Sequence, residues 1–235
     1  MKKRVQTNIP GLDELMAGGI PEGHVVMISG LPGTMKSSLA YNILFNNAKM
    51  EGKKGLYISL EQGRDSITDH MACLGMQHTD VESLLSIVDM GYLRLHMDEH
   101  NGGAENASWI DIFKMYAENM HEKTEYELLV IDSLPVIELM ARMDDRRNDL
   151  FHFFGWLREL GVTTFIVSET SEDAGKVLEE DFLSDGIIRV KKERQGQDIS
   201  RQLVIDKMRS TKHNTGLFTL LHDGKEFRLT RAIGE

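Results

Sequence analysis

A glycine-rich segment constrains this chain more than any other feature of its sequence. It reads G-L-P-G-T-M-K-S-S over residues 30–38, between a strand predicted over His24–Ser29 and a helix predicted over Lys36–Met50. Glycines let the backbone curl so that successive N–H groups point inward at an anion. The N-terminus of the following helix adds N–H donors and a favourable dipole. This strand–loop–helix context predicts a phosphate-binding loop.

Single residues of the loop predict individual contacts. Lys36 can reach the β- and γ-phosphates of a nucleotide, and the Ser37 hydroxyl is placed to ligate Mg²⁺. The match to G-x-x-x-x-G-K-[ST] is imperfect, because Met35 stands where the last glycine belongs. We expect this side chain to weaken binding, slow turnover or shift the loop geometry. The alternative is a glycine-rich turn with an ordinary surface lysine. The predicted nucleotide-binding residues are Gly30, Pro32, Gly33, Thr34, Met35, Lys36, Ser37 and Ser38.

Two further strand ends carry carboxylates. The strand predicted over Glu127–Ile131 ends at Asp132, which can hold Mg²⁺ directly or through water. The strand predicted over Gly55–Leu60 ends at Glu61, which we place next to the phosphate loop, where it could polarise an attacking water. Acids also end strands for turn reasons alone, so both assignments depend on their pairing with the loop. Ser168-Glu169 ends another strand and fits a phosphate sensor or a simple turn equally.

Alternation of strand-like and helix-like segments predicts an α/β fold. It indicates a mostly parallel central sheet flanked by helices, with antiparallel strands near the C-terminus. The 235 residues suit one such domain. The other predicted helices are Arg64–Leu74, Trp109–His121 and Asp144–Leu160. The other predicted strands are Tyr92–Met97, Val162–Val167, Ile187–Lys191, Arg201–Met208, Gly216–Leu221 and Glu226–Thr230, and Asp98–Ser108 reads as a surface loop.

Composition excludes several classes of protein. A net charge of −10 argues against a nucleic-acid-coating protein, although residues 188–235 alone carry +5. That asymmetry fits either two solvated faces or a head-to-tail self-assembly. No apolar run is long enough to span or enter a membrane, and no secretory signal is seen. The single cysteine, Cys73, excludes a disulfide framework, favours a cytoplasmic location and is expected to be a packed thiol.

Several motifs together resemble the KaiC-like ATPases of the RecA superfamily. The segment I-P-G-L-D-E-L-M-A-G-G-I-P-E-G (residues 9–23) precedes the phosphate loop. The resemblance continues in the same order through Y-I-S-L-E-Q (57–62), V-I-D-S-L (130–134), F-I-V-S-E (165–169), L-S-D-G-I-I (183–188) and I-D-K-M-R-S-T-K-H (205–213). It implies a RecA-like P-loop NTPase fold with residues 1–235 as a single domain.

The resemblance also implies roles for individual residues. Lys36 and Ser37 match the phosphate-loop lysine and hydroxyl, and Asp132 matches the acid on the Mg²⁺ side. Glu61 matches the first of an adjacent glutamate pair that usually includes the catalytic base, whereas Gln62 departs from that pair. Asp185 is expected to help close an edge of the site. The implied catalytic residues are Glu61, Lys36, Lys207 and Arg209, and the implied metal ligands are Ser37 and Asp132.

The resemblance implies a homo-oligomer, such as a hexameric ring, that binds ATP and Mg²⁺. In family hexamers, basic residues matching Lys207 and Arg209 extend toward the γ-phosphate of a neighbouring subunit. The alternative for this pair is a charged face on an exposed strand.

Three functions follow from these motifs. The first is slow Mg²⁺-dependent ATP hydrolysis coupled to oligomer assembly or to an unidentified protein partner. The second is a non-hydrolysing nucleotide-binding scaffold, which Met35 and Gln62 favour. A strand-exchange recombinase fits less well, because the chain is acidic and has no added DNA-binding segment.

Overall fold

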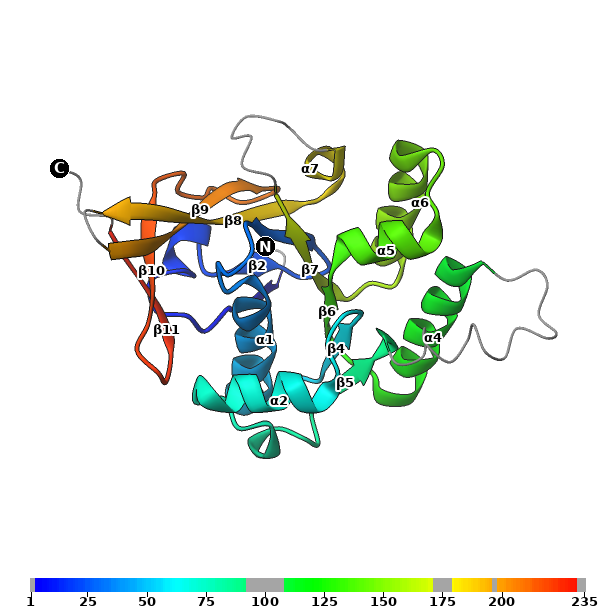
Figure 1. The fold of residues 1–235 in the computed structure, drawn as a ribbon, viewed down its shortest axis with the longest axis horizontal. Coiled ribbons are helices and arrows are strands. Elements are labelled where there is room, and N and C mark those ends of the chain that lie inside the picture. Colours follow the sequence, from blue (N-terminus) through cyan, green and yellow to red (C-terminus); the bar gives the residue numbers. More distant parts are fainter. Residues whose placement is uncertain (1–2, 92–107, 171–178, 196–197, 232–235) are drawn as a thin grey trace.

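Within residues 3–91, 108–170, 179–195 and 198–231, which the computed structural model describes, nine strands form one sheet. Its spatial order is β11-β10-β9-β8-β3-β7-β6-β4-β5 (Figure 1). β3 pairs in parallel with both β7 and β8, and β6, β4 and β5 continue the parallel part. The strands are β3 (Val25–Gly30), β4 (Gly55–Ser59), β5 (Leu85–Asp89), β6 (Leu128–Asp132), β7 (Thr163–Glu169), β8 (Gly186–Gln195), β9 (Asp198–Met208), β10 (Phe218–His222) and β11 (Phe227–Arg231).

β8, β9, β10 and β11 are joined by antiparallel pairings. The predicted α/β architecture, with a mostly parallel sheet and an antiparallel C-terminal extension, is therefore confirmed. Two further short strands, β1 (Arg4–Val5) and β2 (Ile20–Pro21), pair with each other. Parallel strands buried on both faces read as continuous apolar runs, and β3 and β6 show this pattern.

Helices cover both faces of the sheet (Figure 1). On one face, a buried cluster contains side chains from α1 (Lys36–Asn46) and α2 (Arg64–Cys73). On the other face, the cluster draws on α4 (Trp109–Thr124), α5 (Leu134–Ala141) and α6 (Arg146–Glu159). A short helix, α7 (Glu179–Leu183), packs against α6. Among the described residues, no helix has both the length and the apolar character needed to cross a membrane.

Several sequence predictions need correction. The helix predicted over Lys36–Met50 is α-helical only to Asn46 and continues as a π-helical turn over Asn47–Glu51. β5, α5 and α7 were not predicted from the sequence. Cys73 is exposed, so it is not a packed thiol. The strand predicted over Tyr92–Met97 lies outside the described residues, as does nearly all of the loop at Asp98–Ser108.

Candidate functional site

The phosphate loop lies at the carboxyl end of β3, where the strand turns into α1. Gly33 has a φ of +74°, a left-handed conformation that glycine adopts at no steric cost. A Cβ atom on Gly30 would lie 2.1 Å from the carbonyl oxygen of Val190 on β8, so β8 leaves no space there for a side chain. The Thr34 hydroxyl is buried and donates to the Leu31 carbonyl at 2.8 Å. These contacts fix the shape of the loop.

Met35, at the position of the motif's last glycine, has a left-handed backbone conformation that glycine adopts at no steric cost. Its φ of 70° and ψ of 28° lie in the left-handed region, which costs an ordinary L residue about 1–2 kcal/mol. Its side chain packs against the cluster on the α1 side of the sheet. That packing offsets part of the strain and lets the loop keep a left-handed residue directly before Lys36.

Lys36 is buried at the start of α1 and points back into the loop. Its ammonium donates to the Leu31 carbonyl at 3.0 Å. Burial lowers the pKa of this ammonium, while the negative charges of Glu169 and Asp132 act in the opposite direction. A cation held among backbone groups of the loop is placed to meet an anion there.

Asp132 and Ser37 lie together although 95 positions separate them in the sequence. Asp132 ends β6, accepts a 2.5 Å hydrogen bond from the Tyr57 hydroxyl and is hydrogen-bonded to Ser37. Burial raises the pKa of the Asp132 carboxyl, and these hydrogen bonds and Lys36 lower it in part. A hydroxyl beside a carboxylate is a suitable pair of ligands for a hard divalent cation.

The position of Glu61 differs from the prediction. β7 and β6 separate β4 from β3, so Glu61 does not follow a strand adjacent to the phosphate loop. It nevertheless reaches the same carboxyl edge, where burial raises the pKa of its carboxyl and the charges of Asp132 and Glu169 raise it further. The acid at the end of the strand beside β3 is Glu169, whose Cα pairs with Gly30.

Glu169, for which the sequence fits a phosphate sensor or a simple turn equally, lies at the same carboxyl edge as the loop. Its strand-end position in F-I-V-S-E was visible, but only the sheet order shows that β7 lies beside β3. The carboxylates of Glu61, Asp132 and Glu169 therefore all lie close enough to act electrostatically on the buried Lys36. No group of three or more His, Cys, Asp or Glu side chains in the described part of the chain is arranged to hold a metal ion by itself.

Lys207 and Arg209 lie near the amino end of β3, opposite to the end that carries the phosphate loop. The Lys207 ammonium donates to three carbonyl oxygens in or just after α7: Asp181 at 2.8 Å, Phe182 at 3.3 Å and Ser184 at 2.6 Å. Arg209 bonds the Asp185 carboxylate and the Phe182 carbonyl, both at 2.9 Å.

The contacts of Asp185 show where Lys207 and Arg209 lie relative to β3. Its carboxylate accepts from the backbone N–H of Val25, the first residue of β3, at 3.1 Å. Arg158 of α6 bonds the same carboxylate, and these donors hold the pKa of Asp185 below its usual value despite burial. Asp185 is thus at the amino end of β3, and the expectation that it closes an edge of its own chain's phosphate site is wrong.

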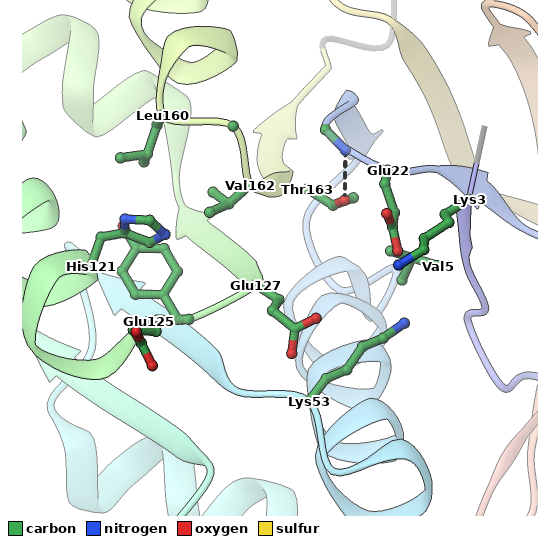
Figure 2. Close-up of a pocket in the computed structure, with 13 residues that line it drawn as sticks. Lys3, Val5, Glu22, Lys53, His121, Glu125, Glu127, Leu160, Val162 and Thr163 are labelled. Atoms are coloured by element: carbon green, nitrogen blue, oxygen red, sulfur yellow. Dashed lines mark hydrogen bonds between the residues drawn. The ribbon is translucent and has the colours of Figure 1, made fainter.

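A pocket of about 310 Å³ also lies at the amino edge (Figure 2). Its lining residues include Gly23, Glu127 and Thr163, which lie within two residues of the starts of β3, β6 and β7. Figure 2 shows lysine and glutamate side chains around its mouth, Lys3 and Glu22 on one side and Lys53 and Glu127 on another. The pocket includes none of the predicted site residues.

Comparisons with known proteins identify the family of this chain. The family model described as "ATPase: KaiC" matches residues 5–221. A UPF0273 protein of Aeropyrum pernix is 31% identical over 91% of this chain and 88% of its own length. A UPF0273 protein of Thermotoga maritima is 29% identical over 91% of this chain and 90% of its own. The circadian clock oscillator protein KaiC of Thermostichus vulcanus is 26% identical, but the chain spans only 42% of it.

A solved structure is similar over nearly the whole chain. The crystal structure of a KaiC-like protein from Pyrococcus horikoshii matches with a TM-score of 0.83 and 27% identity, covering 98% of this chain and 100% of that one. The sequence and structural matches support a nucleotide-binding phosphate loop on a RecA-like fold. The chain belongs to the KaiC ATPase family.

Proposed function

We propose that this protein binds Mg-ATP at the loop of residues 30–38 and hydrolyses it slowly, with turnover coupled to self-association or to a partner. The observation that carries the proposal is the convergence of Lys36, the Ser37–Asp132 pair and Glu61 at one edge of the sheet. These residues come from the start of α1, the end of β6 and the segment after β4, and they fit a polyphosphate with its cation. The loop N–H groups and Lys36 would bind the phosphates, and Ser37 and Asp132 would hold Mg²⁺.

Magnesium, when bound, neutralises charge on the phosphate oxygens. The chain's own residues would then activate the attacking water. Glu61 is the proposed general base, because its raised carboxyl pKa makes it a better proton acceptor than an ordinary exposed glutamate. Gln62 next to it has no carboxylate, which is consistent with a modest rate.

Completion of the site by a second chain is part of the proposal. Arg209 lies near the first residue of β3, whereas the loop follows the last, and the two ends of this strand are about 17 Å apart. Arg209 therefore cannot serve its own chain's phosphates, so any such role needs a neighbouring subunit. Its side chain is 48% exposed, whereas all three donors of the Lys207 ammonium have acceptors in its own chain. Arg209 is thus the stronger candidate for the contact between subunits.

A steady-state ATPase assay of Glu61→Gln tests hydrolysis. We expect kcat to fall about 100-fold or more with KM nearly unchanged, because the substitution removes the base and keeps the shape. Glu159→Gln, at an exposed carboxylate that ends α6, is the matched control and should behave as wild type. Equal kcat values for Glu61→Gln and wild type would contradict this assignment.

The alternative, a nucleotide-binding scaffold with negligible turnover, rests on Met35 and Gln62. It would be favoured if the wild-type protein binds Mg-ATP tightly but releases no phosphate under any assembly condition.

A further inference from the structure

The hairpin of β8 and β9 continues past the end of β3. The pairing of β8 with β3 ends at Gly30 and Val190, whereas β8 stays paired with β9 as far as Gln195 and Asp198. The last residue pairs of β8 and β9 (Figure 1) therefore lie beyond the carboxyl end of β3, the strand from which the phosphate loop starts. Elements at that position can contribute side chains to the nucleotide site.

Lys192 makes the contact between hairpin and loop. Its ammonium donates to the Pro32 carbonyl at 2.8 Å, and a Cβ atom on Gly33 would lie 2.7 Å from the same nitrogen. Its charge also contributes to lowering the pKa of the Lys36 ammonium, after the larger effect of burial. One N–H of the Lys192 ammonium is engaged with Pro32, and among the described residues the other two donors remain available to another acceptor.

The surrounding face of the ribbon is suited to an anion. Strand alternation places Lys192 on the same face as Val190, which packs into the cluster on the α1 side. Its cross-strand partner is Arg201, and like charges directly opposite one another destabilise a sheet. The buried Nε of Arg201 has no hydrogen-bond partner among the described residues.

Like-charged neighbours and an unsatisfied guanidinium nitrogen are both stabilised by a bound anion. A pocket of about 340 Å³ has Lys192 in its lining, together with Glu193, Arg194 and Ile199.

We propose that Lys192 is a second cation of the nucleotide site, supplied in cis by the β8–β9 hairpin, and that it binds the phosphate chain held by the loop. The inference rests on the proposed function, because it needs a polyphosphate at residues 30–38. It differs from the roles of Lys36, which lies within the loop, and of Arg209, which would act from another chain.

Calorimetric titration of Mg-ATP into four variants of the full chain tests the proposal. Lys192→Ala removes both the charge and the contact with Pro32, whereas Lys192→Gln removes the charge but keeps an N–H donor for that carbonyl. Lys192→Arg keeps the charge. Lys191→Ala is the matched control, because Lys191 is exposed and lies on the opposite face of the same strand.

We expect Ala and Gln at position 192 each to weaken Mg-ATP binding about tenfold, the loss of one charge-assisted hydrogen bond. Lys192→Arg should stay close to wild type, and Lys191→Ala should equal it. Thermal unfolding midpoints confirm that each variant is folded.

Three results would overturn the inference: wild-type affinity in Lys192→Ala, wild-type affinity in Lys192→Gln, or an equal loss in Lys191→Ala. The second would show that Lys192 only positions Pro32. A wild-type protein that does not bind Mg-ATP would instead contradict the proposed function itself.

Discussion

Met35 shows how a single residue can depart from a motif while the backbone keeps it. Its φ of 70° is left-handed, and its side chain packs on the α1-side cluster. The sequence indicated that methionine replaces the last glycine of the motif. It could not show whether the backbone would follow the glycine conformation, because that depends on packing between α1 and distant strands.

We predict that glycine at position 35 gives a more stable protein than alanine, the reverse of the usual order within a helix. Met35→Ala loses the packing and keeps the left-handed strain, whereas Met35→Gly loses the packing and removes the strain. The glycine variant should therefore have the higher free energy of unfolding, by about 1 kcal/mol. Urea denaturation of both proteins measures the difference. An alanine variant as stable as the glycine variant would show that the position is unstrained.

Asp132 should show a conflict between stability and function. Its carboxyl pKa is raised in the folded state, so the charged form is disfavoured there relative to the unfolded chain. We expect Asp132→Asn to raise the free energy of unfolding at pH 7 while it weakens Mg-ATP binding. As pH falls through the raised pKa, wild-type Asp132 becomes neutral too, and the gain in stability should disappear. Denaturation at several pH values measures this difference in the free energy of unfolding. A gain that grows toward low pH would show that the charged carboxylate stabilises the folded state, which contradicts the prediction.

At the scale of elements, the sequence predicted where the strands lie along the chain better than which strands pair with one another. Continuous apolar runs identified β3, β4, β6 and β7, because burial on both faces selects such residues. The order β3-β7-β6-β4 places Glu169 beside the loop and moves Glu61 two strands further away. Pairing between strands distant in sequence depends on tertiary packing, so neither Glu169 nor Lys192 could be placed near the phosphate loop from local pattern.

Short elements escaped sequence analysis for a related reason. α7 is five residues long and is held by side chains from other elements, including Lys207, Arg209 and Arg158. Its existence depends on these tertiary contacts more than on helix periodicity. The prediction that Lys207 and Arg209 lie on one strand holds only for Lys207, because β9 ends at Met208 and Arg209 directly follows it.

Lys207→Met tests how far α7 depends on this anchoring. It removes three hydrogen bonds from a cation to carbonyls in and just after α7, and the free energy of unfolding should fall by about 1–3 kcal/mol. Lys212→Met, at an exposed position four residues after the end of β9, serves as control and should change stability by less than about 0.5 kcal/mol. Equal losses in the two variants would indicate that the three hydrogen bonds add no net stability.

Across the whole molecule, the carboxyl and amino ends of the parallel strands carry side chains of opposite charge. Glu61, Asp132 and Glu169 share the carboxyl edge, while Arg158, Lys207 and Arg209 lie around the amino end of β3. Head-to-tail contact would bring the basic cluster of one chain toward the acidic edge of the next. The uneven charge along the sequence fitted either two solvated faces or such polarity, and it did not place these groups at opposite ends of β3.

Mixing two inactive variants tests a site shared between chains. Arg209→Ala keeps an intact loop, and Lys36→Ala keeps an intact Arg209. In random head-to-tail assemblies formed from equal amounts, about a quarter of the interfaces combine both intact parts. ATPase activity should therefore recover to roughly that fraction of wild type. Two singly inactive variants that co-assemble but never recover activity at any ratio would refute the shared site.

The central claim is that the bend between β3 and α1 binds a nucleotide polyphosphate despite Met35, and calorimetric titration with Mg-ATP tests it most directly. We predict saturable binding to the wild-type chain, a loss of roughly 10- to 100-fold in Lys36→Ala, and unchanged affinity in the surface control Lys212→Ala. Absence of binding to the wild-type chain, or equal affinity in wild type and Lys36→Ala, would contradict the claim.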